Sequence, residues 1–126
     1  MGSGAEHKKL KNDALEWLAL AGYFAWPNET GGGHIDGRFI RFGKPGSGDI
    51  LAVLGPDGKH AEFEAKTGRA VQRKGQKTHQ RMVEKRGGLY LVFRSVDDLA
   101  DQLACSGYPP PQNGQSVNSQ SSQPSS

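Results

Sequence analysis

Two carboxylates and a lysine lie on either side of a sharp turn in the middle of the chain. An apolar run begins at Ile50, the turn sequence Gly-Pro-Asp-Gly follows at residues 55–58, and an alternating run ends at Lys66. If the two glycines flank a tight turn, the hairpin register places Asp49 opposite Glu64, with Cβ atoms roughly 5 Å apart. Lys66 then projects from the same strand face as Glu64, two residues farther along.

This arrangement has a direct chemical consequence. Two facing carboxylates repel each other, so a fold that holds them together requires a cation. Mg²⁺ fits, because it prefers hard oxygen ligands and is often held by one or two carboxylates together with water and phosphate. Lys66 can hold a phosphate or the attacking water and stabilise charge that develops on phosphorus. The three residues therefore indicate metal-assisted phosphodiester hydrolysis.

A solvated sheet edge is the alternative interpretation of three charged residues on one strand face. Two observations favour a site instead. The preceding run, Ile50–Leu54, is too apolar for an exposed edge strand, and Asp49 directly follows Gly46-Ser47-Gly48, where a carboxylate can point from the end of a sheet into a cleft.

Hydrophobic periodicity and turn residues predict the elements that position these side chains. The expected helices are residues 7–21, 73–86 and 95–104, and the expected strands are residues 23–26, 38–42, 50–54, 59–66 and 89–93. Residues 28–37, which include three successive glycines, are expected to be a loop, and residues 43–48 a glycine-rich turn. The order of these elements indicates an α/β domain with a mixed sheet.

Length and composition limit the size of that domain and the compartment in which it can fold. The chain has 126 residues, enough for one core, with a folded domain expected at residues 1–108. Residues 109–126 are rich in Ser, Gln and Pro, carry no charge, and are expected to be a disordered tail. The single cysteine, Cys105, excludes an internal disulfide and a thiolate zinc cluster and fits a reducing compartment. No apolar run approaches a membrane span, and no signal peptide is recognisable, so we expect an intracellular protein without a membrane partner.

Basic residues are concentrated in one stretch. Residues 66–94 hold nine basic residues and one acidic residue, whereas the rest of the chain holds seven basic and twelve acidic residues. A local excess of this size indicates a polyanionic partner. A solvated helix face has the same composition, and charge alone leaves both interpretations open.

The order and spacing of these motifs resemble a known nuclease family. Gly-Ser-Gly-Asp49-Ile-Leu is followed by Glu64-Ala-Lys66-Thr-Gly and then by Gln76, eleven residues before a pair of glycines. This set resembles the VRR-NUC domain, the virus-type replication-repair nuclease of the PD-(D/E)XK superfamily, over about Glu6 to Leu103. The resemblance implies a restriction-endonuclease-like core with a mixed β-sheet flanked by helices. The superfamily often has proline where Gly48 precedes the aspartate, but proline supplies no ligand.

The resemblance also implies roles for single residues. Asp49 and Glu64 would ligate Mg²⁺ or Mn²⁺, with the carbonyl of Ala65 as a third ligand, and Lys66 would be the catalytic lysine. Gln76, on the basic helix, would match the glutamine that lines the family's site.

Further site residues come from the first helix and from the basic stretch. The family's first helix supplies a glutamate, and spacing to the helix leucines favours Glu6 over Glu16. Five basic residues are expected to contact DNA phosphates: Arg69, Arg73, Lys74, Lys77 and Arg81.

The leading hypothesis is a Mg²⁺- or Mn²⁺-dependent DNA endonuclease that is selective for branched structures, either Holliday junctions or flaps. No base-reading element is evident in so short a chain, so backbone contacts must dominate. The alternative is a non-catalytic basic module that binds branched DNA or RNA. Free-standing family members look like phage or bacterial junction resolvases, which implies the cytoplasm of a bacterial cell or of a phage-infected host.

A four-way junction must be cut on two strands, which predicts a symmetric homodimer with one site in each copy. The expected contacts are the thin apolar stripe at Met82–Val83 and the aromatic run Tyr23–Trp26. The alternative is a monomer that nicks flaps one strand at a time.

Overall fold

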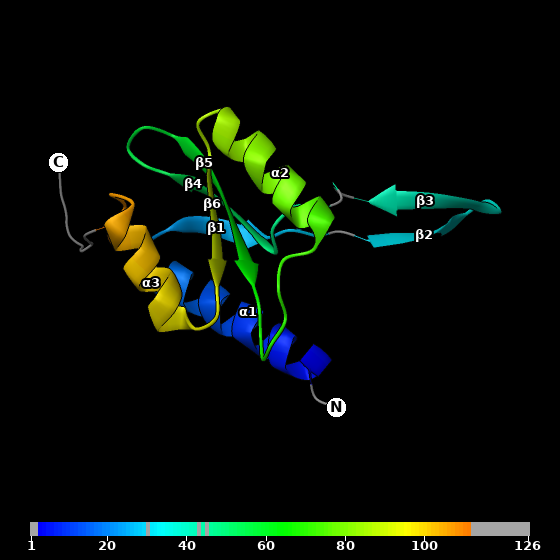
Figure 1. Ribbon diagram of the computed structural model, residues 1–126, viewed down its shortest axis with the longest axis horizontal. Coiled ribbons are helices and arrows are strands. Elements are labelled where there is room, and N and C mark those ends of the chain that lie inside the picture. The colour runs from blue at the N-terminus through cyan, green and yellow to red at the C-terminus, as the bar shows by residue number, and fades with distance from the viewer. Residues whose placement is uncertain (1–2, 30, 43, 45, 112–126) are drawn as a thin grey trace, which may run out of the picture.

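The computed structural model describes residues 3–29, 31–42, 44 and 46–111. The elements in chain order are α1 (Ser3–Leu20), β1 (Phe24–Pro27), β2 (Gly31–Ile35), β3 (Arg38–Phe42), β4 (Ile50–Leu54), β5 (Lys59–Ala65), α2 (Lys74–Lys85), β6 (Leu89–Phe93) and α3 (Val96–Cys105). Four strands form one sheet in the order β1-β4-β5-β6, and β2 and β3 form a separate two-stranded sheet that extends to one side (Figure 1). The expected α/β class with a mixed sheet flanked by helices is confirmed.

The β4–β5 hairpin has the register that the turn sequence predicts. Leu54 pairs with Lys59 and Ile50 with Phe63, so the next pair outward is Asp49 and Glu64. On its other side β5 pairs in parallel with β6, which makes β5 an interior strand with neighbours on both edges.

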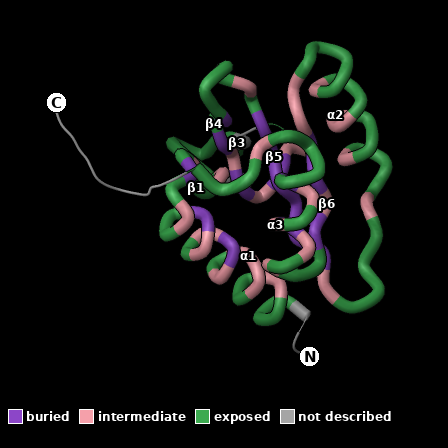
Figure 2. The backbone as a smooth tube through the Cα atoms, turned by 90° about the vertical axis from the view of Figure 1, so that its left-hand side faces the viewer, coloured by how far each residue is buried: buried purple, intermediate pink, exposed green. Residues whose placement is uncertain are grey.

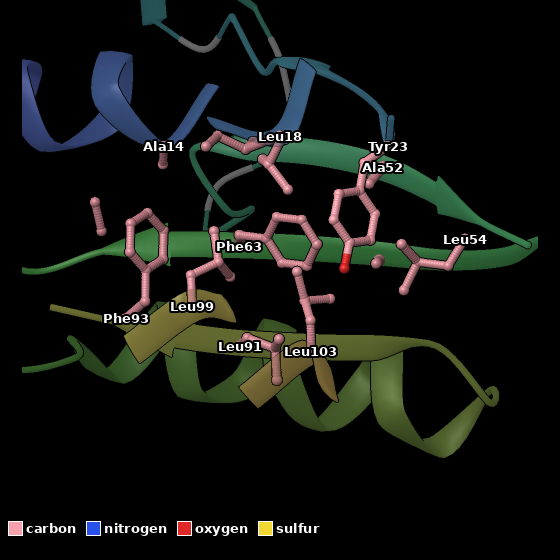
Figure 3. Packing of buried hydrophobic residues seen from close by; sticks show 13 residues of the cluster. Ala14, Leu18, Tyr23, Ala52, Leu54, Phe63, Leu91, Phe93, Leu99 and Leu103 are labelled. Carbon is pink, nitrogen blue, oxygen red and sulfur yellow. The ribbon is translucent and has the colours of Figure 1, made fainter. Parts of the chain in front are cut away.

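The apolar core lies between the sheet and helices α1 and α3. On β5 the alternate residues Ala61, Phe63 and Ala65 point to this side and are all buried. Figure 3 shows Phe63 among Leu18 of α1 and Leu103 of α3, in one continuous cluster. Since burial of each large apolar side chain contributes about 1.5–3 kcal/mol, this layer supplies the main stabilisation of the domain.

The opposite face of the sheet carries a polar layer beneath α2. Here Glu62 is 4%, Glu64 1% and Lys66 9% exposed. Helix α2 has no buried residue of its own, and Figure 2 shows buried backbone along the sheet and α1 but none along α2. The solvated-edge interpretation of the charged strand face is therefore excluded.

The prediction of a loop at residues 28–37 is wrong for residues 31–35. Gly31–Ile35 forms β2, which pairs antiparallel with β3 in a register of Ile35 with Arg38. The connecting residues Asp36 and Gly37 both have positive φ, at 52° and 73°, as the tight hairpin turn of an Asp-Gly pair requires.

Smaller differences concern the ends of the chain. Helix α1 begins four residues earlier than expected, at Ser3. Of the expected tail, residues 109–111 follow α3 without regular secondary structure, and residues 112–126 lie outside the described part of the chain. Within the described residues, no helix is long and apolar enough to cross a membrane.

Candidate active site

Asp49 lies directly before β4, and its side chain continues the hydrogen bonding between β4 and β5. Its Oδ2 accepts a hydrogen bond from the Ala65 backbone N–H at 2.8 Å, where a strand carbonyl would otherwise be expected. His7 Nε2 of α1 lies 3.2 Å from the same oxygen. The backbone N–H of Asn28, just after β1, donates to the Asp49 carbonyl at 2.9 Å. Asp49 is thus fixed by α1, β1 and β5 together.

The glycine before Asp49 is required by close packing. A Cβ atom at Gly48 would lie 3.1 Å from the Glu62 Cβ and from the Phe63 backbone nitrogen. At Gly46, a Cβ atom would collide with the Gly75 carbonyl of α2. The segment before Asp49 therefore passes tightly between β5 and α2, which accounts for its glycines.

Glu64 is a buried carboxylate whose two oxygens have different surroundings. Oε1 accepts hydrogen bonds from the Tyr90 hydroxyl at 2.5 Å and from Gln72 Nε2 at 3.4 Å. Oε2 accepts no hydrogen bond among the described residues, but it lies 2.7 Å from Lys66 Nζ. Burial and the adjacent Glu64 raise the pKa of Tyr90 well above its usual range, so this hydroxyl stays protonated as a donor.

Lys66 connects the carboxylate layer to α2. Besides its contact with Glu64, its Nζ donates to Gln76 Oε1 at 2.9 Å. The same Gln76 oxygen accepts from the Arg73 backbone N–H at 2.9 Å, which closes the first turn of α2. From the sequence, a metal ion alone was expected to compensate the two carboxylates. In the structure, Lys66 already compensates Glu64.

A small cavity adjoins this cluster. It has a volume of about 330 Å³ and lies between the beginning of α1 and the loop after β5, with Glu6, His7, Lys66 and Arg69 among its lining residues. Glu16 does not line it. The structure thus brings Glu6 to the same region as Lys66, next to His7. Sequence reasoning gave no role to His7, because the four histidines show no metal-ligand spacing.

The five basic residues expected to contact DNA are all exposed. Arg69 lies in the loop between β5 and α2, and Arg73 caps the N-terminus of α2. Lys74, Lys77 and Arg81 are on α2 itself. In the described part of the chain none of the five forms an ion pair with a carboxylate, so their charges are available to an external anion.

A second polar cluster that sequence reasoning missed surrounds Glu62. Its Oε1 accepts from the Gly48 N–H at 2.9 Å, from Ser47 Oγ at 3.2 Å and from His79 Nε2 of α2 at 2.9 Å. Its Oε2 lies 2.7 Å from His60 Nε2. Burial opposes ionisation, but the Gly48 N–H and the two histidines outweigh it and lower the pKa of Glu62. Glu62 therefore holds the segment before Asp49 against both β5 and α2.

We expect Glu62→Gln to lower the free energy of unfolding by about 1–3 kcal/mol at neutral pH, because a buried charged acceptor is replaced by a neutral one. Since the pKa of Glu62 is lowered on folding, its contribution is present at neutral pH and is lost as the carboxylate takes up a proton in acid. Urea unfolding at neutral and acid pH measures the effect. An equal difference between variant and wild type at both pH values would contradict this role.

The donors suit a hard cation with few protein ligands. Among the residues that the structure describes, no group of three or more His, Cys, Asp or Glu side chains is placed to hold a metal ion. Asp49 and Glu64 supply two carboxylates, and among the described residues the buried Glu64 Oε2 faces the Lys66 ammonium but accepts no hydrogen bond. Mg²⁺ usually keeps several waters and takes only one or two carboxylates, so this donor set fits it.

Comparisons of the chain with protein-family models, with curated proteins and with solved structures found no match.

Proposed function

We propose that the protein is a divalent-metal-dependent endonuclease with a restriction-endonuclease-like core that cleaves branched DNA. The observation that carries this proposal is the cluster of Asp49, Glu64 and Lys66 at one end of the sheet, next to exposed cations that have no acidic partner among the described residues. The resemblance of the same motifs to the VRR-NUC domain supports it. On that resemblance we also place the enzyme in the cytoplasm of a bacterial cell or of a phage-infected host.

Each residue of the cluster has a role in this proposal. Asp49 and Glu64, with the Ala65 carbonyl, would hold Mg²⁺ or Mn²⁺, which when bound polarises the phosphate and acidifies a water molecule. Lys66 Nζ would stabilise the negative charge that develops on the phosphate oxygens. Gln76 positions Lys66 from α2.

Glu6 and His7 lie where a substrate would enter, because they line the cavity beside Lys66. Since the sequence contains no obvious base-reading element, the selection would be structural and would act through phosphate contacts.

A cleavage panel tests the proposal. Blunt duplex, flap, splayed-arm and four-way junction DNA are incubated with Mg²⁺ or Mn²⁺, with the Asp49→Ala variant as the control for contaminating nucleases. We expect metal-dependent cleavage of at least one branched substrate by the wild type and none by the variant. Binding of branched DNA without cleavage under any of these conditions would instead indicate the non-catalytic binding module.

The basic residues are expected to dominate the salt dependence of binding. Replacing Lys77 and Arg81 by glutamine should flatten the slope of log affinity against log salt by about 0.9 for each phosphate that is no longer neutralised. The DNA structure that the protein prefers should not change, because Lys77 and Arg81 would each neutralise a phosphate that every one of these substrates offers. Fluorescence anisotropy in EDTA measures the slope. The matched control, Arg38→Gln with Lys9→Gln, removes the same charge elsewhere and should leave the slope unchanged, whereas equal slopes in both double variants would contradict the assignment.

We also propose a symmetric homodimer with one site in each copy. Of the contacts expected from sequence, Tyr23 is buried in the core, whereas Phe24, Trp26 and Met82 are exposed. Exposed apolar side chains also occur on the β2–β3 hairpin, where Ile35 is 52% and Phe39 58% exposed, and we place the proposed contact there. A two-stranded sheet is marginally stable by itself, so packing against a second copy would stabilise it.

Sedimentation equilibrium at micromolar concentration tests the dimer. We expect a species of twice the 13.6 kDa chain mass for the wild type and a shift to the monomer for Phe39→Asp. A single species at 13.6 kDa, with and without junction DNA, would exclude the dimer and favour a monomer that nicks flaps.

A further inference from the structure

An exposed aromatic pair lies on the edge strand of the main sheet. Phe24 and Trp26 are alternate residues of β1, so they project from the same face, and their ring centroids are 5.1 Å apart. Phe24 is 68% and Trp26 38% exposed. They belong to neither the apolar core nor the candidate active site.

The sheet register connects this pair to a large cavity under α2. Phe24 pairs with Val53 of β4, and Val53 pairs with His60 of β5. Residues paired in this way share one face of the sheet, which here is the face that α2 covers. His60 in turn lines a cavity of about 1020 Å³ whose other wall is α2. The aromatic pair and the cavity therefore lie on the same face of the sheet, and we term the two together the α2 groove.

The chemistry of the α2 groove is apolar with a basic rim. Met82 and Val83 supply an apolar wall, and Lys44, Lys74 and Arg86 supply three cations. No acidic side chain is among the described residues that line the cavity. Such a surface complements a ligand that has both flat apolar faces and regularly spaced negative charges.

The strand that carries the aromatic pair runs toward the candidate active site. Trp26 is two residues before Asn28, whose backbone N–H donates to the carbonyl of Asp49 at 2.9 Å. A chain lying across the aromatic pair would therefore end beside the metal-binding carboxylates.

We propose that the α2 groove binds the unpaired single strand of a branched DNA substrate, with bases stacked on Phe24 and Trp26 and phosphates on the basic rim. This inference rests on the proposed nuclease function and narrows its substrates to those with a single-stranded arm. Stacking is indifferent to sequence because every base has a π-face, and a row of cations follows the backbone. A second copy of the chain is a poorer occupant, because a twofold contact here would bring the same three cations together.

The test measures binding in EDTA, so that it does not depend on cleavage. Labelled oligothymidine of about 12 nucleotides, splayed-arm DNA and blunt duplex are titrated with wild type, Trp26→Ala, Arg86→Gln and the control Leu20→Ala. Leu20 is an exposed apolar residue of α1, the helix whose Leu18 packs in the core on the sheet face opposite α2. We expect Trp26→Ala to weaken binding of oligothymidine and splayed arms about tenfold, while its affinity for duplex stays within about twofold. Leu20→Ala should leave all three affinities unchanged. Arg86→Gln should weaken binding of oligothymidine and splayed arms although it keeps both aromatic rings.

Failure of this inference is distinguishable from failure of the proposed function. No binding of oligothymidine by wild type, or equal losses for duplex and single strand in Trp26→Ala, would overturn the inference even if the enzyme cleaves four-way junctions. Conversion of a dimer to a monomer by Trp26→Ala with unchanged oligothymidine affinity would assign the groove to a second copy and likewise overturn it. Selective loss of single-strand affinity supports it even if the cleavage panel shows no activity.

Discussion

Replacing Lys66 by methionine is expected to slow DNA cleavage by at least about 100-fold while DNA affinity stays within about threefold. Methionine preserves much of the aliphatic stem of this side chain, which is 11% exposed, but removes the ammonium group. In our proposal that group stabilises charge on the transition-state phosphate, and loss of one such preorganised donor costs about 10²–10³ in rate. Single-turnover cleavage at saturating Mn²⁺ measures the rate, and anisotropy in EDTA measures affinity.

Two controls accompany this experiment: the stability of the Lys66→Met variant, and a second variant that changes only how Lys66 is positioned. Lys66→Met leaves Glu64 Oε2 without its cation, so urea unfolding must show that the variant is folded at the assay temperature. Gln76→Leu removes the amide that holds Lys66 but keeps the ammonium group, so its effect on rate should be smaller. Cleavage by Lys66→Met within threefold of the wild-type rate would contradict a catalytic role for Lys66.

The part of this site that could be predicted from sequence depends on local geometry. The turn at residues 55–58 has strong turn chemistry, and β4 and β5 have clear patterns on each side of it. A hairpin with a short turn has a register fixed by that turn, so the pairing of Asp49 with Glu64 followed from the sequence. The position of Lys66 on the same face followed from strand alternation.

The rest depends on contacts between distant segments. Nothing in the pattern of α2 showed that it would cover Glu62, because no residue of α2 becomes buried when it does so. The contact of His7 with Asp49 joins residues 42 positions apart, and no spacing rule indicates such a contact.

The β2–β3 hairpin was missed for a different reason. Asp36-Gly37 is a good hairpin turn, but three glycines before it are typical of a loop, and the strand pattern on that side is absent from the sequence.

The buried polar layer under α2 contributes less to stability than an apolar layer would, and a functional role would explain its presence. Burying a charged pair such as Glu64 and Lys66 often contributes less stability than apolar residues of the same size would. This layer nevertheless occupies the centre of the sheet, where β5 is covered on both faces. The wild type is therefore expected to be less stable without metal than a chain with an apolar layer here, and to gain stability when a cation binds.

Because a bound cation should stabilise the fold, we expect Mn²⁺ to raise the melting temperature of the wild type but not that of Glu64→Gln or Asp49→Asn. A ligand that binds only the folded state stabilises it in proportion to the logarithm of its concentration over Kd. Each variant removes one of the two carboxylates, so both should lose this stabilisation and cleavage together. Thermal unfolding with increasing Mn²⁺, and with EDTA, measures it without an activity assay.

The two variants should differ in metal-free buffer, which separates metal binding from general damage to the fold. Asn at position 49 still accepts the Ala65 N–H and relieves the repulsion from Glu64, so Asp49→Asn should be as stable as the wild type or slightly more stable. Glu64→Gln leaves the ammonium group of the buried residue Lys66 without its counter-charge. The free energy of unfolding of this variant should therefore fall by about 1–3 kcal/mol. If Mn²⁺ stabilised Glu64→Gln as much as the wild type, Glu64 would not be a metal ligand, and its burial would be explained by the pair with Lys66 alone.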